Sequence, residues 1–172
     1  MGDERLALPL VGRSGERERI DTAWQAVRDG SSDNRLLVLS GDPGIGKSRL
    51  TRYAIDVAHA NGAGVIEINC GHGYRQVGLG AVRRGIEKAL GVRAAPEPGE
   101  TRAALEARAD QVGLSTGARH VLELLVGDAD PAVPAPELTP DRLRESIIAA
   151  LLEWIVAEAK AAPVALVVED VH

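Results

Sequence analysis

One segment of the sequence combines residue types and spacing that suit phosphate binding. Its pattern, G-x-x-x-x-G-K-[ST], follows an apolar run and precedes a helix-like segment. Glycines allow the backbone to curl so that its N–H groups approach phosphate oxygens, and the start of a helix adds partial positive charge. The lysine ammonium can reach the β- and γ-phosphates, and the serine hydroxyl can ligate Mg²⁺. The residues are Gly41, Asp42, Pro43, Gly44, Ile45, Gly46, Lys47 and Ser48.

Two carboxylates near the end of the sequence form the second chemically suited group. The continuous apolar run over residues 163–168 predicts a strand buried on both faces, and Glu169 and Asp170 follow it. In a nucleotidase with such a phosphate loop, an acid at a strand tip holds Mg²⁺, and a neighbouring acid orients the attacking water. Adjacent strand residues point to opposite sides, so a regular strand would assign Glu169 to Mg²⁺ and Asp170 to the water. The order of the two stays open, and a merely solvated strand end is the competing interpretation.

The segments around the phosphate loop predict a βαβ unit. Residues 36–40 have the pattern of a strand, residues 49–60 that of a helix, and residues 65–69 that of a second strand. A crossover of this kind makes the two strands parallel. The loop would then lie at the carboxyl end of the first strand, where open α/β sheets bind ligands.

Helices account for most of the remaining sequence. Ser14 is a predicted cap for a helix that ends near Asp29, and further helices are predicted over 81–90, 100–112 and 118–126. Thr139 is expected to cap a long helix with proline at its first position, running to Ala161. Apolar residues recur along it and predict packing on one face. They are Leu143, Ile147, Ile148, Leu151, Leu152, Ile155 and Val156.

Composition restricts the class of protein. The 172 residues are 45% hydrophobic and 26% charged, which is ordinary for a globular domain. The net charge of −5 gives no bulk electrostatic basis for binding nucleic acid or a membrane surface. Cys70 is the single cysteine, which excludes an internal disulfide and fits a reducing compartment, and the start of the sequence lacks the apolar core of a signal peptide. We therefore expect a cytoplasmic protein.

Three motifs together resemble a known family. They are Leu10-Val11-Gly12-Arg13, the run from Ser40 through Lys47 and Ser48 to Arg49 and Leu50, and the run from Leu166 to His172. In combination they look like the AAA-type ATPase module of the STAND class, found in large bacterial regulators linked to nucleotide cyclases or to helix-turn-helix domains. The resemblance implies ATP and Mg²⁺ as ligands, with Arg49 beside the phosphate loop and Val11, Gly12 and Arg13 near the adenine. A plain apolar strap on the first helix is the other interpretation of that last segment.

The resemblance also implies a fold and a domain plan. We expect an α/β P-loop NTPase with a parallel three-layer sandwich, truncated after the acidic strand, and a helical insert at about 80–160. Residues 1–172 would form one incomplete domain. Its parts are a strap and helix over 9–34, the βαβ unit over 35–70, a helical region over 80–162 and the acidic strand over 163–172. The family implies a further strand between residues 36–40 and 164–169, which this sequence lacks, so two apolar edges would stay unpaired or would pair directly.

The expected function is an ATP-binding regulatory switch that reports to attached signalling domains, on either side of this segment, in signal transduction or transcription. Hydrolysis by this segment alone is doubtful on that interpretation, whereas binding needs only the loop and the acids. Two other functions are alternatives. One is a P-loop kinase of a small molecule, which would use the same loop, and the other is a nucleotide-free scaffold. Labelled γ-phosphate would appear on a small molecule for a kinase and as free phosphate for an ATPase. Lys47 is expected to face solvent when no ligand is bound.

Overall fold

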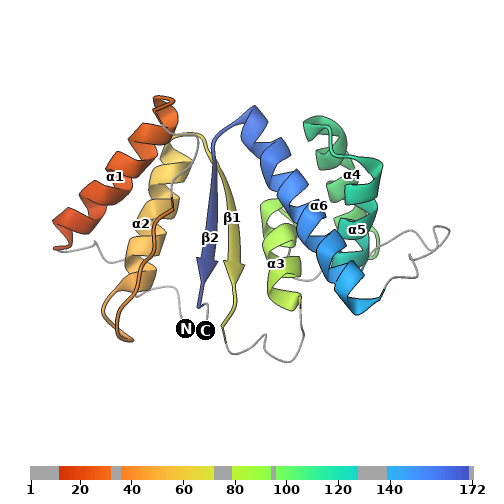
Figure 1. Ribbon diagram of the computed structural model, residues 1–172, viewed down its shortest axis with the longest axis horizontal. Helices are drawn as coiled ribbons and strands as arrows, with labels where there is room; N and C mark the ends of the chain where they lie inside the picture. Colours follow the sequence, from red (N-terminus) through yellow and green to blue (C-terminus); the bar gives the residue numbers. More distant parts are fainter. Residues whose placement is uncertain (1–11, 32–35, 72–78, 94–95, 128–138, 171–172) are drawn as a thin grey trace. The chain divides into compact units, whose positions relative to one another are not determined.

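The computed structural model describes residues 12–31, 36–71, 79–93, 96–127 and 139–170. The chain divides into two compact units, Met1–Ala63 and Gly64–His172. The first unit carries the phosphate loop and two helices. The second carries a two-stranded sheet and four helices among its described residues. Figure 1 shows the helices and strands of both units.

In the first unit, α1 (Ser14–Arg28) packs against α2 (Lys47–Ala60). Ile20 of α1 and Leu50 and Ile55 of α2 are buried apolar side chains of this unit. Polar contacts also join the helices. The Tyr53 hydroxyl donates to the Asp21 carboxylate at 2.9 Å, the Arg17 guanidinium lies 4.7 Å from the Tyr53 ring centre, and Arg28 donates to Asn61 at 2.6 Å. These contacts hold α1 to α2 at several points along their length.

The predicted strand over residues 36–40 is absent from the structure, which assigns no regular element there. Leu36 is 87% exposed and Val38 is 77% exposed. A strand needs a neighbour for its backbone N–H and C=O groups, and no described segment pairs with this one. The predicted βαβ unit is therefore represented by its helix and its second strand only.

The second unit is built on β1 (Gly64–Asn69) and β2 (Val164–Glu169), which pair in parallel from Gly64↔Val164 to Asn69↔Glu169. The arrows for both strands run in the same direction in Figure 1. β2 corresponds to the predicted acidic strand and β1 to the second predicted strand. In the described residues the sheet has these two strands, so the predicted three-layer sandwich is not seen.

Helix α3 (Gly80–Ala89) covers the edge of β1 that faces away from β2. The Gly64 and Cys70 N–H groups donate toward β2, so backbone alternation turns the Glu67 carbonyl to the opposite edge. At Gly85 the helix backbone lies so close that an added Cβ would come within 2.7 Å of the Glu67 oxygen. Glycine is therefore needed for this approach of helix to strand.

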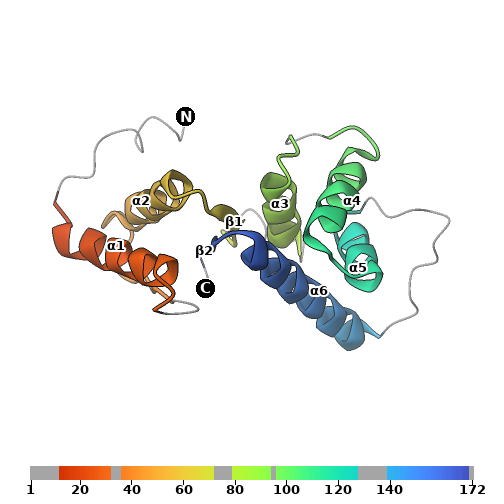
Figure 2. The same cartoon turned by 90° about the horizontal axis from the view of Figure 1, so that it is seen from above.

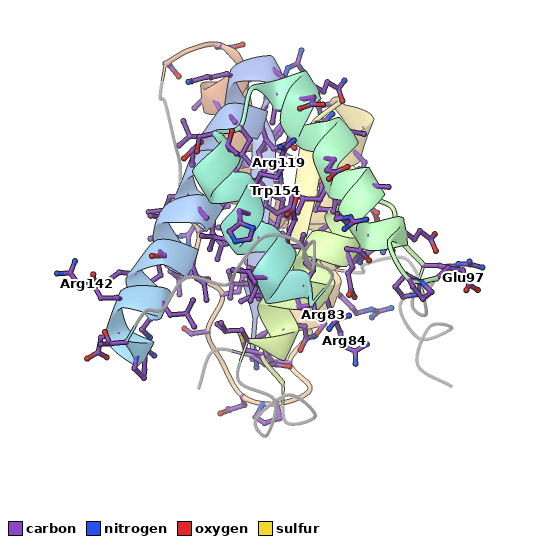
Figure 3. All side chains as sticks on the ribbon, turned by 90° about the vertical axis from the view of Figure 1, so that its right-hand side faces the viewer. Arg83, Arg84, Glu97, Arg119, Arg142 and Trp154 are labelled. Atoms are coloured by element: carbon purple, nitrogen blue, oxygen red, sulfur yellow. The ribbon has the colours of Figure 1, made fainter. Side chains whose placement is uncertain are left out.

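The remaining helices are α4 (Glu100–Val112), α5 (Thr116–Val126) and α6 (Pro140–Ala161). From above, they lie beside α3 in Figure 2. α4 and α6 have the predicted bounds, and the Thr139 hydroxyl accepts from the Arg142 N–H as a helix cap. Their buried side chains share one core, within which Trp154 lies (Figure 3). The buried members are Ile66, Ile86, Leu105, Ala118, Leu122, Val126, Ala150 and Trp154.

The Nε and Nη2 groups of Arg108 in α4 donate to the two carboxylate oxygens of Glu158 in α6, and the Trp154 indole N–H donates to the same carboxylate at 2.9 Å. The hydrogen bond to Glu158 raises the pKa of Arg108, so the cation is retained at any relevant pH. Glu158 is only 9% exposed as a residue, and a buried carboxylate needs such partners. The pair therefore fixes α4 on α6 while satisfying a charge inside the helical core.

Two sequence expectations need correction. Ser14 does not cap α1; it is the first helical residue, and Arg13 occupies the cap position without a capping side chain. The apolar residues of α6 also do not pack on one face, because Ile147 is buried whereas Ile148, Leu152 and Val156 are exposed. The exposed three are spaced by four residues and form a second apolar line on the helix. Val11 lies outside the described residues, as does most of the predicted loop over 127–140.

Candidate phosphate-binding site

The phosphate loop has the tight curl that its glycines predict. Gly41, Gly44 and Gly46 have φ angles of 150°, 82° and 101°, which side-chain-bearing residues rarely adopt. The Ile45 side chain folds back over Gly41, where an added Cβ would lie 3.3 Å from the Ile45 methyl group. Gly46 then leads directly into α2. The sequence spacing thus produces a compact turn at the start of a helix of 14 residues.

The N-terminus of α2 is suited to an anion. No side chain caps it, and its first turn holds no acidic residue. The unpaired N–H groups and the helix dipole at such an end favour a negatively charged ligand. Ser48 is exposed in this first turn. The residues at this position therefore fit a phosphate group and leave the Ser48 hydroxyl available to a metal ion.

The sequence predicted that Lys47 faces solvent when no ligand is bound, but the structure gives its ammonium two partners in the loop. Its ammonium donates to the carbonyl oxygens of Gly41 at 2.7 Å and Asp42 at 3.1 Å. The cation is thus folded against the loop that its own helix follows. Because these carbonyls stabilise the ammonium, a phosphate would have to replace them as the partners of Lys47. The same geometry shows that Lys47 reaches the interior of the loop.

Arg13 also contacts the loop. One guanidinium nitrogen donates to the Ile45 carbonyl at 2.9 Å, and another lies 2.6 Å from the Glu16 carboxylate. That hydrogen bond to Arg13 lowers the pKa of Glu16, which keeps the carboxylate charged. By resemblance, Arg13 was expected near an adenine; the structure places its side chain on the phosphate loop. Gly12 has a φ of 75° beside it.

A hollow of about 240 Å³ lies beside the loop within the first unit. Arg13, Ile45 and Lys47 line it together with apolar residues. Glu16 and Arg19 of α1 contribute to its wall and were missed by sequence reasoning. A glutamate three residues after an arginine in the first turn of a helix is a known pairing signal, so Glu16 could have been found. The other lining residues are Ile20, Leu37, Val38, Leu39, Ser40 and Leu50.

The two candidate acids belong to the second unit. Glu169 ends β2 on the same side of the sheet as Asn69, its register partner. It lines a groove of about 530 Å³ between the sheet and α3, with Glu67, Arg84 and Lys88. The Lys88 ammonium lies 2.7 Å from the Glu67 carboxylate in this groove. The acidic residue types suit Mg²⁺, although no group of three or more metal-binding side chains occurs among the described residues.

Asp170 does not continue the strand. Its φ of 56° is left-handed, so the simple rule that neighbours point to opposite sides does not apply to it. Its carboxylate approaches Gly71, where an added Cβ would lie 3.3 Å from Oδ2. The Gly71 N–H donates to the Asn69 side chain at 2.9 Å in the same turn. The premise for separating the roles of Glu169 and Asp170 by strand alternation therefore fails.

Comparisons with known proteins are consistent with a phosphate-binding loop at residues 41–48. An uncharacterized protein of Rhizobium meliloti (strain 1021), R02095, is 29% identical over 169 residues, covering 98% of this chain and 16% of that protein's length. No solved structure matches the chain. In the described residues, no helix has both the length and the apolar character needed to cross a membrane. The AAA ATPase domain family matches residues 9–172, and its domains generally bind ATP with Mg²⁺ through a P-loop α/β fold. The chain belongs to the AAA ATPase domain family.

Proposed function

We propose that this chain is an ATP-binding regulatory switch of the STAND type, with weak or no hydrolysis as an isolated module. The observation that carries the proposal is the Lys47 ammonium folded onto the Gly41 and Asp42 carbonyls at an uncapped helix start. A cation held in a glycine turn is positioned to exchange carbonyl partners for phosphate oxygens. The match to the AAA ATPase domain family supports ATP as the nucleotide.

Each candidate residue has a role in this proposal. The backbone from Gly41 to Gly46 surrounds the phosphates, Lys47 binds the terminal ones, and Arg49 supports the first turn of α2. Ser48 would supply a ligand to Mg²⁺, and Glu169 and Asp170 would share the roles of metal-directed acid and water-orienting acid. When bound, Mg²⁺ neutralises charge on the phosphate oxygens. The complete domain would be a three-layer α/β sandwich. Attached domains would receive the signal, since the R. meliloti relative is far longer than this chain.

A thermal-shift measurement with Mg-ATP tests nucleotide binding. Ligand at 100 times its Kd should stabilise the fold by about 2.7 kcal/mol, and Lys47→Ala should abolish that gain while leaving the unliganded protein folded. Lys160→Ala, which removes an exposed lysine from the last turn of α6, is the matched control and should keep the full gain. An absent shift at millimolar ATP in the unaltered protein would support a nucleotide-free scaffold. An undiminished shift in Lys47→Ala would place the nucleotide elsewhere.

A further inference from the structure

Arg13 is held in an unusual backbone conformation at the start of α1. Its φ is 58° and that of Gly12 is 75°, so two successive residues are left-handed. Glycine adopts this conformation freely, but an arginine there is strained. Strain of this kind persists where the surrounding structure imposes it and is a reason to ask what the side chain does. In this case the side chain reaches a carbonyl 32 positions away in the sequence, that of Ile45.

The element that carries Arg13 is fixed to the helix that carries Lys47. Asp21 and Arg17 of α1 both contact Tyr53 of α2, and Arg28 contacts Asn61. Ile20 and Leu50 are buried beside these polar contacts. The start of α1, from which Arg13 extends, is therefore held against α2. A hydrogen bond from a side chain anchored in this way can restrict the loop that precedes α2.

The guanidinium has a second, orienting contact. Glu16 lies in the first turn of α1, and its carboxylate is 2.6 Å from a second guanidinium nitrogen of Arg13. A planar guanidinium bound at two nitrogens has a fixed direction, which a lysine ammonium could not reproduce. Lys47 binds the loop at Gly41 and Asp42, and Arg13 binds it at Ile45. The two cations thus hold different parts of the same turn.

We infer that Arg13 is a positioning residue that braces the phosphate loop in its binding-competent curl, and that it acts on the loop rather than on the base or a particular phosphate. This inference rests on the proposed function, since it concerns the same loop. Lys47 must leave its carbonyls when phosphate arrives, whereas Arg13 can keep its bond to Ile45. Loss of the brace reduces the fraction of molecules with a competent loop, and the apparent affinity for every ligand of that loop falls by the same factor.

The experiment compares three probes: Mg-ATP, Mg-ADP and inorganic tripolyphosphate with Mg²⁺, measured by calorimetry on the full chain. Arg13→Met should weaken all three by one common factor of about tenfold, the value of a hydrogen bond to a charged donor. Arg13→Lys should not restore the affinity. Arg52→Met is the matched control, because Arg52 is an exposed arginine of α2 that pairs with Asp56 of the same helix at 3.1 Å and does not line the hollow. It should change each affinity by less than about twofold if charge alone matters little.

The alternatives give different results. A role on the adenine would leave tripolyphosphate binding unchanged, and a role on the terminal phosphate would weaken ATP more than ADP; either result overturns the inference. Hydrogen exchange of the unliganded protein is the second readout: Arg13→Met should speed exchange at the amides of residues 44–48 and leave α4 and α6 unchanged. Unchanged exchange would also overturn it. If the unaltered protein binds none of the three probes, the proposed function fails first, which is a distinguishable outcome.

Discussion

At the scale of residues, two cations hold different parts of the phosphate loop: Lys47 donates to the Gly41 and Asp42 carbonyls, and Arg13 donates to the Ile45 carbonyl. The spacing from Gly41 to Ser48 dictates the turn because glycine alone tolerates its φ angles. The contact of Lys47 with loop carbonyls was not predicted, since the sequence gives residue types and not the partners of an unliganded cation. Arg13 was expected near the site only by family resemblance. Its partner Glu16 carried a local pairing signal that went unused.

Acid titration of Glu16 is a residue-scale prediction. Its pKa is lowered chiefly by the hydrogen bond from Arg13, so the contact is fully present above the ordinary glutamate pKa and is lost as the pH falls through the lowered one. We expect the side-chain carboxyl carbon of Glu16, followed by NMR, to titrate at lower pH than in Arg13→Met. Equal midpoints for Glu16 in the two proteins would contradict the pair.

At the scale of elements, helices with strong end signals were predicted best. Thr139 and the following proline fix the start of α6, and Gly99 and Gly113 with left-handed φ bound α4. Residues 36–40 failed as a predicted strand because apolar pattern alone does not supply a pairing neighbour. The two-sided exposure of α6 also could not be predicted, since its apolar residues cover more of the helix than one packed face requires.

The approach of α3 to β1 gives an element-scale prediction. Gly85→Ala would place a Cβ within 2.7 Å of the Glu67 carbonyl oxygen, and we expect a loss of about 1–3 kcal/mol in the free energy of unfolding from overpacking. Gly117→Ala in α5 is the control, because nothing lies within 4 Å of its added Cβ. It should be neutral or stabilising by up to about 1 kcal/mol. Urea unfolding measures both, and similar values for the two variants would contradict the packing described for α3.

At the scale of the whole molecule, several apolar side chains face outward in each unit. In the second unit, Leu166 and Val168 of β2 are exposed, although their register partner Ile66 is buried in the core and Ile68 packs against that core. In the first unit, residues 36–39 are exposed. Apolar surface of this kind is ordinarily covered in a finished assembly. The family resemblance predicted that two apolar edges would stay unpaired or would pair directly with each other, whereas composition and periodicity alone could not show which faces would be exposed.

Paired alanine variants on α6 test whether the exposed apolar line of that helix, formed by Ile148, Leu152 and Val156, is open in solution. Ile147→Ala removes a buried side chain and should cost about 2–5 kcal/mol in the free energy of unfolding. Leu152→Ala removes one that is 57% exposed and should stay within about 0.5 kcal/mol of the unaltered chain. Urea titrations at low protein concentration compare them. A cost for Leu152→Ala as large as for Ile147→Ala would mean that this line of α6 is covered in solution.

The position of α3 has a consequence for growth of the sheet. Since α3 blocks the outer side of β1 at Gly85, any additional strand, whether from the same polypeptide or a neighbour, must join at β2. Within the described residues that leaves a single side for extension. Two molecules meeting there would consume both available sides, and association would stop at a pair instead of propagating into a fibre.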